Sequence, residues 1–373
     1  MRYKKTKNCG EELSILGFGC MRLPATSEGK VDRPQAIQLI RYGIDHGINY
    51  LDSAYVYHGG ESETILGEAL LDGYREKANI ATKLPTWFIR KQDDMDRYLD
   101  EQLKRLQTDH IDFYLIHGLG KDRWDHITDL GVAEFLDDAL ADGRIRYAGF
   151  SYHDSPDNFK NIVDGYEWTF AQIQYNFMDE DYQAGTVGLK YAAYRGLDVV
   201  VMEPLKGGML TRPVPAIDEI RAEANGRTAA SFGLQWVWDH PEVDVVLSGM
   251  STIDQLKENL KYADESNANR LTSSELALIE RMRTTYRERT KVECTRCEYC
   301  MPCPFGVDIP GCLGIYNNSY MYDDTAQMKM VYNTYMAEGC ASKCTECGEC
   351  EEKCPQRLPI RETLQDIATH FGK

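Results

Sequence analysis

The sequence predicts an α/β chain in which a closed (β/α)8 barrel is followed by a smaller C-terminal domain of helices and loops. Short apolar, β-prone runs alternate with amphipathic helical stretches over about 285 residues. The chain has 373 residues, which suits one large barrel with an appendage. Of its 12 cysteines, all but Cys9 and Cys20 follow residue 290. We therefore predict two domains, residues 1–285 and 286–373.

The barrel prediction depends on the order of the expected elements. Strands are expected at residues 15–20, 50–53, 79–83, 111–117, 147–151, 170–175, 198–202 and 245–248. Apolar residues at three- and four-residue spacing predict helices at 33–46, 61–71, 94–106, 132–141, 156–163, 186–194 and 228–239. Alternation of this kind makes the strands parallel, because each crossover helix returns the chain to the same end of the sheet. A doubly wound open sheet remains the alternative, and residues 11–14 are expected in a small N-terminal hairpin under the barrel.

Composition excludes several function classes. With 43% hydrophobic and 27% charged residues, the chain is neither disordered nor membrane-spanning. Its 42 Lys and Arg against 59 Asp and Glu give a net charge of −17, which disfavours nucleic acid and anionic membrane as partners. The first residues do not form a secretory signal, and no run approaches the ~18 apolar residues of a membrane span. We therefore expect a cytoplasmic protein, in which cysteines stay reduced.

Ionisable side chains stand at the ends of three neighbouring expected strands: Asp52, Lys83 and His117. Tyr57 follows Asp52 by five residues, in the loop above. Each alone also fits a structural role, as a helix cap, a solvated ammonium or a packed histidine. Together, at the carboxyl ends of barrel strands, they predict one catalytic pocket. A buried lysine beside a tyrosine stabilises the phenolate, so we expect a lowered Tyr57 pKa and a tyrosine that acts as general acid.

These residues belong to a longer pattern that resembles the aldo-keto reductase family of NAD(P)H-dependent carbonyl reductases. The segments that carry the resemblance are 17–23 (GFGCMRL), 49–57 (NYLDSAYVY), 61–63 (ESE), 82–83 (TK), 111–117 (IDFYLIH), 149–151 (GFS), 172–176 (QIQYN), 203–205 (EPL) and 258–259 (EN). The resemblance implies that Tyr57 protonates a carbonyl oxygen and that Lys83 and Asp52 adjust the acidity of Tyr57. It also implies that His117 orients the substrate. Hydride would come from the nicotinamide.

The resemblance also implies a cofactor site across the strand ends. It places Ser151 and Gln172 at the nicotinamide carboxamide and Met202 under the nicotinamide ring. The remaining residues that it assigns to the cofactor are Gly19, Met21, Glu203, Pro204, Leu205, Gly207, Ser248, Gly249, Gln255, Glu258 and Asn259.

Several positions depart from the family pattern. Many relatives hold the 2′-phosphate of NADPH with a Lys and an Arg, where this chain has Gly249 and Gln255. Loss of two cations predicts acceptance of NADH. Tyr152 replaces an asparagine that often follows the carboxamide serine, and Met202 replaces a stacking aromatic residue. Side chains expected to wall the substrate pocket are Trp87, Tyr55 and His58.

The C-terminal cysteines form two regularly spaced runs. Cys344, Cys347, Cys350 and Cys354, followed by Pro355, have the spacing of bacterial ferredoxins, in which three close cysteines bind one 4Fe–4S cluster and the fourth binds its neighbour. Cys294, Cys297, Cys300 and Cys303 are one residue shorter in their last interval. We expect two 4Fe–4S clusters, one held by Cys294, Cys297, Cys300 and Cys354, the other by Cys303, Cys344, Cys347 and Cys350.

Alternatives to this cluster assignment remain open. Paired Cys-x2-Cys spacing also forms tetrahedral zinc sites. Cys312 and Cys340 are expected as packing residues, although Cys340 could replace Cys344 as a ligand, and the shortened run could reduce the count to one cluster. This tail resembles a two-cluster ferredoxin domain, and its union with the barrel resembles the iron–sulfur branch of the aldo-keto reductases.

Three functions follow from this union. The first is a carbonyl-reducing oxidoreductase whose clusters exchange electrons with a redox protein or brace the tail. The second is a cluster-dependent redox enzyme that uses another cofactor, for which a flavin is possible although no motif supports one. The third is an electron-transfer module with an idle barrel. Nicotinamide passes a hydride, whereas a cluster takes one electron at a time, so the two halves do not couple without a mediator.

Overall fold

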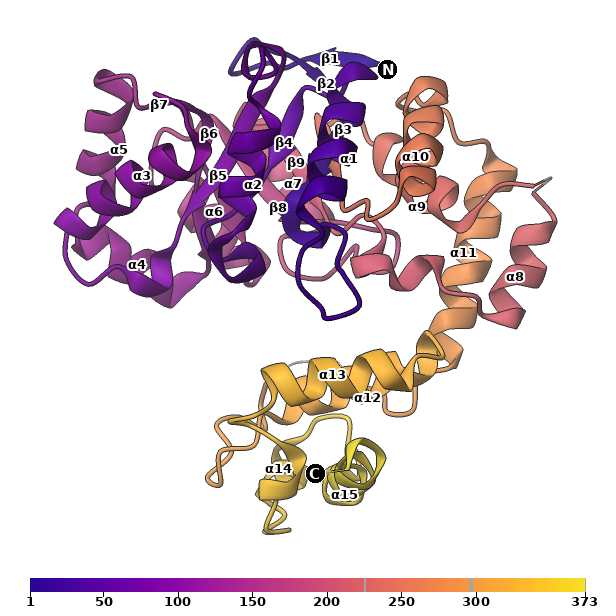
Figure 1. The fold of residues 1–373 in the computed structure, drawn as a ribbon. Helices are drawn as coiled ribbons and strands as arrows, with labels where there is room; N and C mark the ends of the chain where they lie inside the picture. Colours follow the sequence, from indigo (N-terminus) through magenta and orange to yellow (C-terminus); the bar gives the residue numbers. More distant parts are fainter. Residues whose placement is uncertain (225, 295–297, 373) are drawn as a thin grey trace. The chain divides into compact units, whose positions relative to one another are not determined.

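Eight parallel strands close into a barrel in the computed structural model, which describes residues 1–224, 226–294 and 298–372. The last strand pairs with the first, with Val246 opposite Leu16 and Leu247 opposite Gly17. This closure confirms the barrel and rules out the open sheet, because neither edge is left unpaired. Figure 1 labels the barrel strands β3 (Leu16–Gly19), β4 (Tyr50–Asp52), β5 (Asn79–Leu84), β6 (Ile111–Leu119), β7 (Ile145–Tyr152), β8 (Phe170–Gln174) and β9 (Asp198–Met202). Strand β10 (Val245–Ser248) completes the barrel.

Helices connect successive strands, and the expected ones lie within two residues of their expected bounds. Helix α4 was not expected, because its sequence is too polar to show an apolar stripe. No helix in the described ranges is long and apolar enough to cross a bilayer. The helices are α1 (Arg33–Asp45), α2 (Ser62–Ala69), α3 (Asp93–Leu106), α4 (Lys121–Asp129), α5 (Val132–Ala141), α6 (Pro156–Val163), α7 (Gly185–Tyr194), α9 (Ala229–Trp238) and α10 (Ile253–Glu265), with short 3-10 turns η1 (Cys20–Arg22), η2 (Tyr57–Gly60), η3 (Arg75–Lys77), η4 (Thr86–Phe88) and η5 (Lys206–Thr211).

Local sequence signals fix several helix ends. The Asp32 carboxylate accepts the Gln35 N–H at 3.1 Å and starts α1, where Pro34 fits the first turn. The Thr252 hydroxyl caps α10 in the same way, accepting the Gln255 N–H at 3.2 Å. Helix α3 has aspartates in its first turn and basic residues in its last, which complements the helix dipole.

The barrel interior is a packed apolar core. Tyr50 and Phe113 pack with ring centroids 5.0 Å apart, and Phe113 contacts Phe170 edge-on at 5.2 Å. Strands β1 (Tyr3–Lys5) and β2 (Glu12–Ser14) pair antiparallel, and Leu13 of β2 joins the core. The expected N-terminal hairpin is therefore confirmed. The full core cluster is Leu13, Tyr50, Ala81, Phe113, Leu115, Phe170, Val200, Val245 and Leu247.

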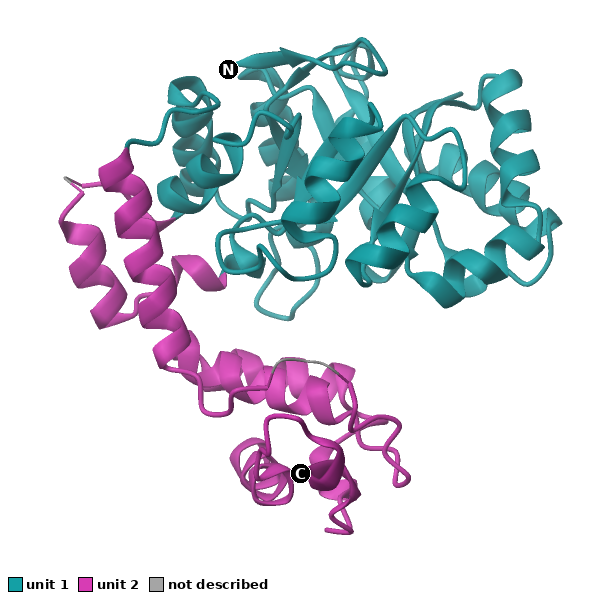
Figure 2. Cartoon of the chain, turned by 180° about the vertical axis from the view of Figure 1, so that it is seen from behind, with its two compact units in different colours: residues 1–208, 230–272 teal, residues 209–229, 273–373 magenta. Residues whose placement is uncertain are grey.

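The chain divides into two compact units, coloured separately in Figure 2. Unit 1 comprises residues 1–208 and 230–272, which contain the barrel. Unit 2 comprises residues 209–229 and 273–373. Unit 2 therefore contains an internal segment as well as the C-terminal tail, so the two compact units are not continuous along the sequence. The domain boundary at residue 285 stays a prediction.

Unit 2 is built from helices around the cysteine-rich loops. Its helix α13 begins at Thr325 and ends at Tyr335. The Asp324 carboxylate starts α13 by accepting the Gln327 N–H at 3.0 Å, and it pairs with Arg212 at 3.0 Å. Helices α13 and α15 both pack against α12. The helices are α8 (Pro215–Ala222), α11 (Ser273–Glu288), α12 (Ile309–Met321), α13 (Thr325–Tyr335), α14 (Glu349–Lys353) and α15 (Ile360–Phe371), with the 3-10 turn η6 (Ala341–Lys343).

Candidate active site

Three neighbouring barrel strands carry ionisable side chains toward one end of the barrel. Asp52 is the last residue of β4, Lys83 lies near the end of β5, and His117 lies near the end of β6. The register pairs Asp52 with Ala81 and Lys83 with Leu115, so parallel pairing places these side chains at the same end. The convergence expected from the sequence is therefore present.

Lys83 and Asp52 form a buried ion pair. Lys83 Nζ donates to both Asp52 carboxylate oxygens at 2.8 Å and to the Ser53 carbonyl oxygen at 2.6 Å. The side chains of Lys83 and Asp52 are 1% and 5% exposed, so water screens the pair little. Burial disfavours the charged ammonium, yet Asp52 and Tyr57 outweigh it and raise the pKa of Lys83. Burial raises the pKa of Asp52, against the opposing effect of Lys83.

Tyr57 stands beside this pair. The Lys83 ammonium lies 5.1 Å from the centre of the Tyr57 ring, and the His117 ring lies 6.2 Å from it, nearly perpendicular. Burial raises the pKa of Tyr57 above its ordinary value of 10.0, although Lys83 works in the opposite direction. The expected lowering of the Tyr57 pKa is therefore wrong for the chain without a bound cofactor: loss of water outweighs the neighbouring ammonium.

The turn that carries Tyr57 depends on residues that tolerate a left-handed backbone. His58 and Gly59 have φ of 52° and 66°, a conformation that glycine adopts without strain. The His58 ring bridges this turn to η1, because its Nε2 lies 3.1 Å from the Cys20 carbonyl oxygen. Ser53 donates to Ser62 at 2.9 Å and ties the end of β4 to α2. These contacts fix the loop that presents the phenol.

His117 is neutral at physiological pH. Burial and, to a smaller extent, the Lys83 ammonium and the Arg123 guanidinium lower its pKa well below 6.5. Its Nδ1 is buried and has no hydrogen-bond partner in the described structure. The Trp87 ring packs edge-on against the imidazole, with centroids 4.6 Å apart. A neutral imidazole can donate one N–H to a ligand while its other nitrogen accepts.

A second buried network of hydrogen bonds holds strand β5, which carries Lys83. The Glu63 carboxylate accepts from Thr82 at 2.7 Å and from Gln102 at 2.6 Å, and it pairs with Arg105 at 3.3 Å. Gln102 also donates to the Lys83 carbonyl oxygen at 3.0 Å. Because every member has a partner, the network holds the Lys83 backbone in place.

The residues expected at a nicotinamide carboxamide lie on adjacent strands. Ser151 of β7 and Gln172 of β8 are paired in register, and both are buried. The Ser151 hydroxyl accepts the Gly118 N–H at 2.7 Å, and Gln172 Nε2 lies 3.7 Å from the Met202 sulfur. Gln172 Oε1 is buried and has no hydrogen-bond partner among the described residues. A buried acceptor without a hydrogen bond costs free energy, and a carboxamide N–H that donated to this oxygen would remove that cost. The residues present therefore fit the nicotinamide.

The remaining expected cofactor residues lie along β9, β10 and α10. Asn259 donates to Ser248 Oγ at 2.9 Å, and Gln255 Oε1 accepts the Ser251 N–H at 2.9 Å. Gly207 has φ of 65° within η5. Met21 is 54% exposed. The others occupy the expected segments: Gly19 ends β3, Glu203, Pro204 and Leu205 follow β9, Gly249 follows β10, and Glu258 lies on α10.

Arg22, which sequence reasoning did not select, reaches this same region. Its aliphatic stem lies over Gly249, where an added Cβ would come within 3.1 Å of it. Its guanidinium approaches Gly207, where an added Cβ would lie 2.9 Å from Nη2. Two glycines thus leave room for one arginine. No spacing signal marks Arg22, because the approach depends on barrel closure between distant segments.

The three expected pocket residues differ in their surroundings. Trp87 and His117 line an open hollow at the protein surface. Tyr55 donates to Glu101 at 3.1 Å, and the Arg105 guanidinium lies 3.9 Å from its ring centre. His58 is held by its contact with the Cys20 carbonyl oxygen. Trp87 is thus the one of the three that lines this hollow.

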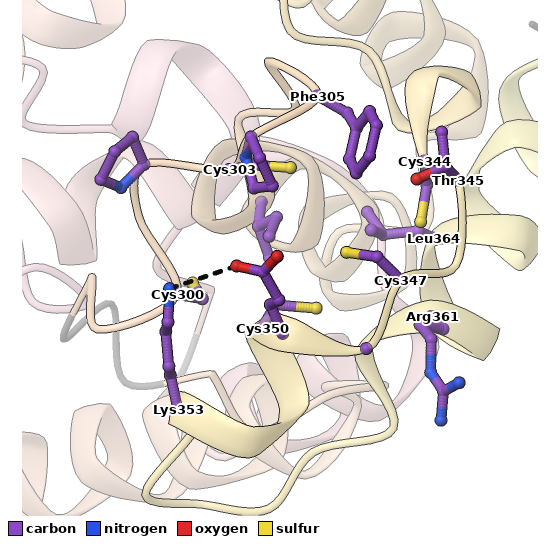
Figure 3. A pocket seen from close by; sticks show the side chains of 15 residues that line it. Cys300, Cys303, Phe305, Cys344, Thr345, Cys347, Cys350, Lys353, Arg361 and Leu364 are labelled. Carbon is purple, nitrogen blue, oxygen red and sulfur yellow. Dashed lines mark ion pairs between the residues drawn. The ribbon is translucent and has the colours of Figure 1, made fainter.

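Cysteine side chains in unit 2 surround two hollows. One, of about 380 Å3, is lined by Cys300, Cys303, Cys344, Cys347 and Cys350. Figure 3 shows the sulfurs of Cys303, Cys344, Cys347 and Cys350 around this space, with Cys300 to one side near Lys353. The other hollow, of about 330 Å3, is lined by Cys294, Cys300 and Cys354. Thiolates facing a common space are the donor set of an iron–sulfur cluster, so these residues fit that group.

Cys300 lines both hollows, so the expected division of the cysteines between two clusters stays a prediction. Cys297, the remaining expected ligand of the second hollow, lies outside the described residues. Cys312 and Cys340 line neither hollow. Cys312 is buried and its thiol donates to the Gly339 carbonyl oxygen at 3.4 Å. Among the described side chains, no three Cys, His, Asp or Glu residues converge closely enough to bind a single metal ion.

Comparison with known proteins identifies the barrel. The model of the aldo/keto reductase family matches residues 15–283. The chain belongs to this family. A model of a 4Fe–4S dicluster domain matches residues 293–358. The resemblance read from the sequence is therefore confirmed for both halves, and the tail is a 4Fe–4S domain.

The relatives of this aldo/keto reductase match about three quarters of its chain. It is 28% identical to the uncharacterized oxidoreductase YqkF of Bacillus subtilis over 75% of this chain and 96% of that protein. It is 26% identical to the methylglyoxal reductase YeaE of Escherichia coli, over 74% and 96% of the two chains. Among solved structures, the holo form of aldo-keto reductase AKR11C1 from Bacillus halodurans matches with a TM-score of 0.64 and 28% identity, covering 75% of this chain and 96% of that one. An aldo/keto reductase from Klebsiella pneumoniae in complex with NADP and acetate matches with a TM-score of 0.61 and 26% identity, over 75% and 95%.

Proposed function

We propose that this aldo/keto reductase reduces the carbonyl of a small aldehyde or ketone to an alcohol with NAD(P)H. The observation that carries the proposal is the buried Lys83 ammonium, held 2.8 Å from both Asp52 oxygens and beside the Tyr57 ring. A relative named methylglyoxal reductase and a solved relative in complex with NADP support it.

Tyr57 is the proton donor in this proposal. Its raised pKa keeps the phenol protonated at neutral pH, which is the form that a general acid needs. As the carbonyl carbon accepts a hydride, Tyr57 transfers its proton to the carbonyl oxygen, and the C=O double bond becomes a C–OH group. Lys83, fixed by Asp52, stabilises the phenolate that remains. Neutral His117 donates a hydrogen bond to the same oxygen and orients the carbonyl.

Ser151 and Gln172 would hold the nicotinamide carboxamide, with Gln172 Oε1 accepting its N–H. Arg22, between Gly207 and Gly249, would hold the cofactor phosphates. When bound, NAD(P)H supplies the hydride. Since Arg22 is the cation found here and Gly249 and Gln255 carry no charge, we propose that the site accepts NADH as well as NADPH.

The tail would hold two 4Fe–4S clusters, one on Cys303, Cys344, Cys347 and Cys350, the other on Cys294, Cys297, Cys300 and Cys354. Such clusters transfer single electrons. We propose a redox protein as the external partner of this tail.

A second candidate function is favoured by the dicluster domain itself. The chain could be a redox enzyme in which electrons pass through the clusters to a flavin or to a partner protein, or an electron-transfer module with an idle barrel. In the redox enzyme, turnover would not need the Tyr57 proton, and in the electron-transfer module the barrel would reduce no carbonyl.

Steady-state reduction of aldehydes by the cluster-loaded protein tests these functions. We expect Tyr57→Phe to lose roughly 10²- to 10⁴-fold in kcat, which is the usual contribution of general acid catalysis. Unchanged thermal unfolding and iron content would show that the variant is intact. Turnover equal to that of the unaltered protein would reject the proposed function. Anaerobic addition of NADH followed by EPR then separates the alternatives: reduced-cluster signals would indicate electron transfer between cofactor and tail.

A further inference from the structure

The hollow beside His117 contains charged side chains that the proposed reaction does not use. It lies between the ends of β6 and β7 and the start of α4. Trp87 and His117 form its inner wall, and the other lining residues are Gly118, Gly120, Lys121, Asp122, Arg123, His153, Asp154 and Asn158. Because His117 belongs to the proposed catalytic group, a substrate whose carbonyl reaches His117 would extend into this hollow.

Arg123 is a partly buried cation in this hollow. Its guanidinium lies 4.8 Å from the centre of the Trp87 ring, and Nη1 donates to the Gly118 carbonyl oxygen. No carboxylate lies within ion-pair distance of Arg123 in the described parts of the chain. A guanidinium has five N–H donors, so most of its capacity is free for a ligand. Burial lowers the pKa of Arg123, which shows that part of its hydration is lost.

The other charged groups of the hollow have hydrogen-bond or ion-pair partners or face water. Lys121 Nζ pairs with Asp125 at 2.6 Å. The Asp154 carboxylate accepts the Lys121 N–H at 2.8 Å, the Asn158 side chain at 2.9 Å and the Ser155 N–H at 2.6 Å. Asp122 is exposed to water on α4. Burial lowers the pKa of His153 and leaves its ring neutral. Among the described residues that line this hollow, Arg123 is thus a half-buried cation that has no carboxylate partner.

We propose that Arg123 binds an anionic group, a carboxylate or a phosphate, at the far end of the carbonyl substrate. This inference rests on the proposed function. Arg123 and His117 both contact the Trp87 indole, with the guanidinium 4.8 Å and the imidazole centre 4.6 Å from the ring centre. The substrate is therefore short: its anion and its carbonyl lie about one aromatic ring apart, and the Trp87 ring packs against the carbon skeleton between them.

A matched substrate pair tests the carboxylate form of this proposal. The cluster-loaded protein is assayed with 4-carboxybenzaldehyde and with its methyl ester, which differ in charge but share the aldehyde. Charge-assisted hydrogen bonds predict a kcat/KM ratio of roughly 10 to 100 in favour of the acid. Arg123→Gln should reduce that ratio to near one, while Arg123→Lys, which keeps the charge, should retain part of it. Lys121→Gln is the matched control, because it removes a positive charge from the same hollow and should retain the full ratio. A full ratio in a folded Arg123→Gln variant would overturn the proposal.

A second pair distinguishes the two anions. Glyceraldehyde 3-phosphate and glyceraldehyde are compared in the same variants. A preference that depends on Arg123 for the phosphate ester alone would assign the site to phosphate, and one for 4-carboxybenzaldehyde alone would assign it to carboxylate. If Arg123→Gln changes neither preference, the proposal is wrong.

Binding without turnover separates this inference from the proposed function. Titration calorimetry measures the affinity of the full chain for terephthalate and inorganic phosphate. We expect Arg123→Gln to weaken one of them at least tenfold and Lys121→Gln to leave it unchanged. Such binding without any aldehyde reduction would reject the proposed function and retain the Arg123 site. Aldehyde reduction without dependence on Arg123 in either assay would retain the function and reject the site.

Discussion

Lys83 Nζ lies 2.8 Å from each carboxylate oxygen of Asp52, and the side chains of this pair are almost fully buried. A buried ammonium with a carboxylate partner affects both the stability of the fold and the electrostatics of the site. It fixes a positive charge next to Tyr57 and depends on Asp52 to stay charged. The following expectations come from this pair and from the groups around it.

Asp52→Asn should destabilise the fold. It leaves Lys83 buried without its partner, and breaking a buried pair costs about 3–5 kcal/mol. Urea unfolding of the variant measures this loss. Asp125→Asn, which breaks the exposed pair with Lys121, is the control and should cost much less. Equal losses in the two variants would show that burial does not govern the Asp52 pair.

His117 should make the fold sensitive to acid. Its pKa in the folded chain lies well below 6.5, so at pH below 6.5 the unfolded chain binds a proton that the folded chain does not. Stability contributed by His117 is therefore present above pH 6.5 and is lost as the pH falls. Between pH 6.5 and 5.5 the loss is at most about 1.4 kcal/mol. Unfolding at the two pH values should show a smaller loss in His117→Asn, and an equal loss in both proteins would contradict this.

Gln172→Leu should weaken nicotinamide binding. The variant removes the buried Oε1 that has no partner, and a neutral hydrogen bond corresponds to a roughly 2- to 10-fold change in affinity. Fluorescence titration with NADPH measures it. The control ligand is 2′-phospho-ADP-ribose, which lacks the nicotinamide. If the affinity of that control ligand falls as much as that of NADPH, Gln172 does not bind the carboxamide.

Arg22→Gln should weaken the binding of both NADH and NADPH by roughly 10- to 100-fold, since it removes a cation from the groove between Gly207 and Gly249. Arg33→Gln is a suitable control, because Arg33 pairs with Glu68 at 2.6 Å instead. Equilibrium titration of each variant measures the change. A selective loss of NADPH alone would mean that Arg22 contacts the 2′-phosphate and not the phosphates that both cofactors share.

Cys347→Ala should lose about half of the iron and sulfide, because Cys347 lines one of the two cysteine hollows. Cys312→Ala should retain both, since Cys312 lines neither and its thiol bonds to Gly339. Chemical analysis of anaerobically purified protein decides this. Iron lost equally from both variants would mean that Cys312 takes part in cluster binding.

Strands such as β4 were predictable because they are short runs buried on both faces, as Tyr50 and Leu51 show. The convergence of Asp52, Lys83 and His117 was predictable because parallel strands end at the same edge. The direction of the Tyr57 pKa shift was not, because it is the difference between desolvation and attraction to Lys83, and desolvation depends on packing.

Two arginines escaped sequence reasoning for a related reason. Arg22 lies against Gly207 and Gly249, more than 180 residues away along the chain, and barrel closure alone brings them together. Arg123 lies on α4, a helix whose polar sequence gave no signal. Its importance comes from its lack of a carboxylate partner in the described structure, which only tertiary contacts reveal.

Transfer of deuterium tests the central claim most directly. The cluster-loaded protein is given an aldehyde and NADPH that carries two deuterium atoms at C4 of the nicotinamide, and the alcohol is analysed by mass spectrometry. Direct reduction assisted by Tyr57 should leave one deuterium on the former carbonyl carbon, and Tyr57→Phe should form almost no labelled alcohol. An alcohol without label, or equal labelling by the Tyr57→Phe variant, would contradict the account.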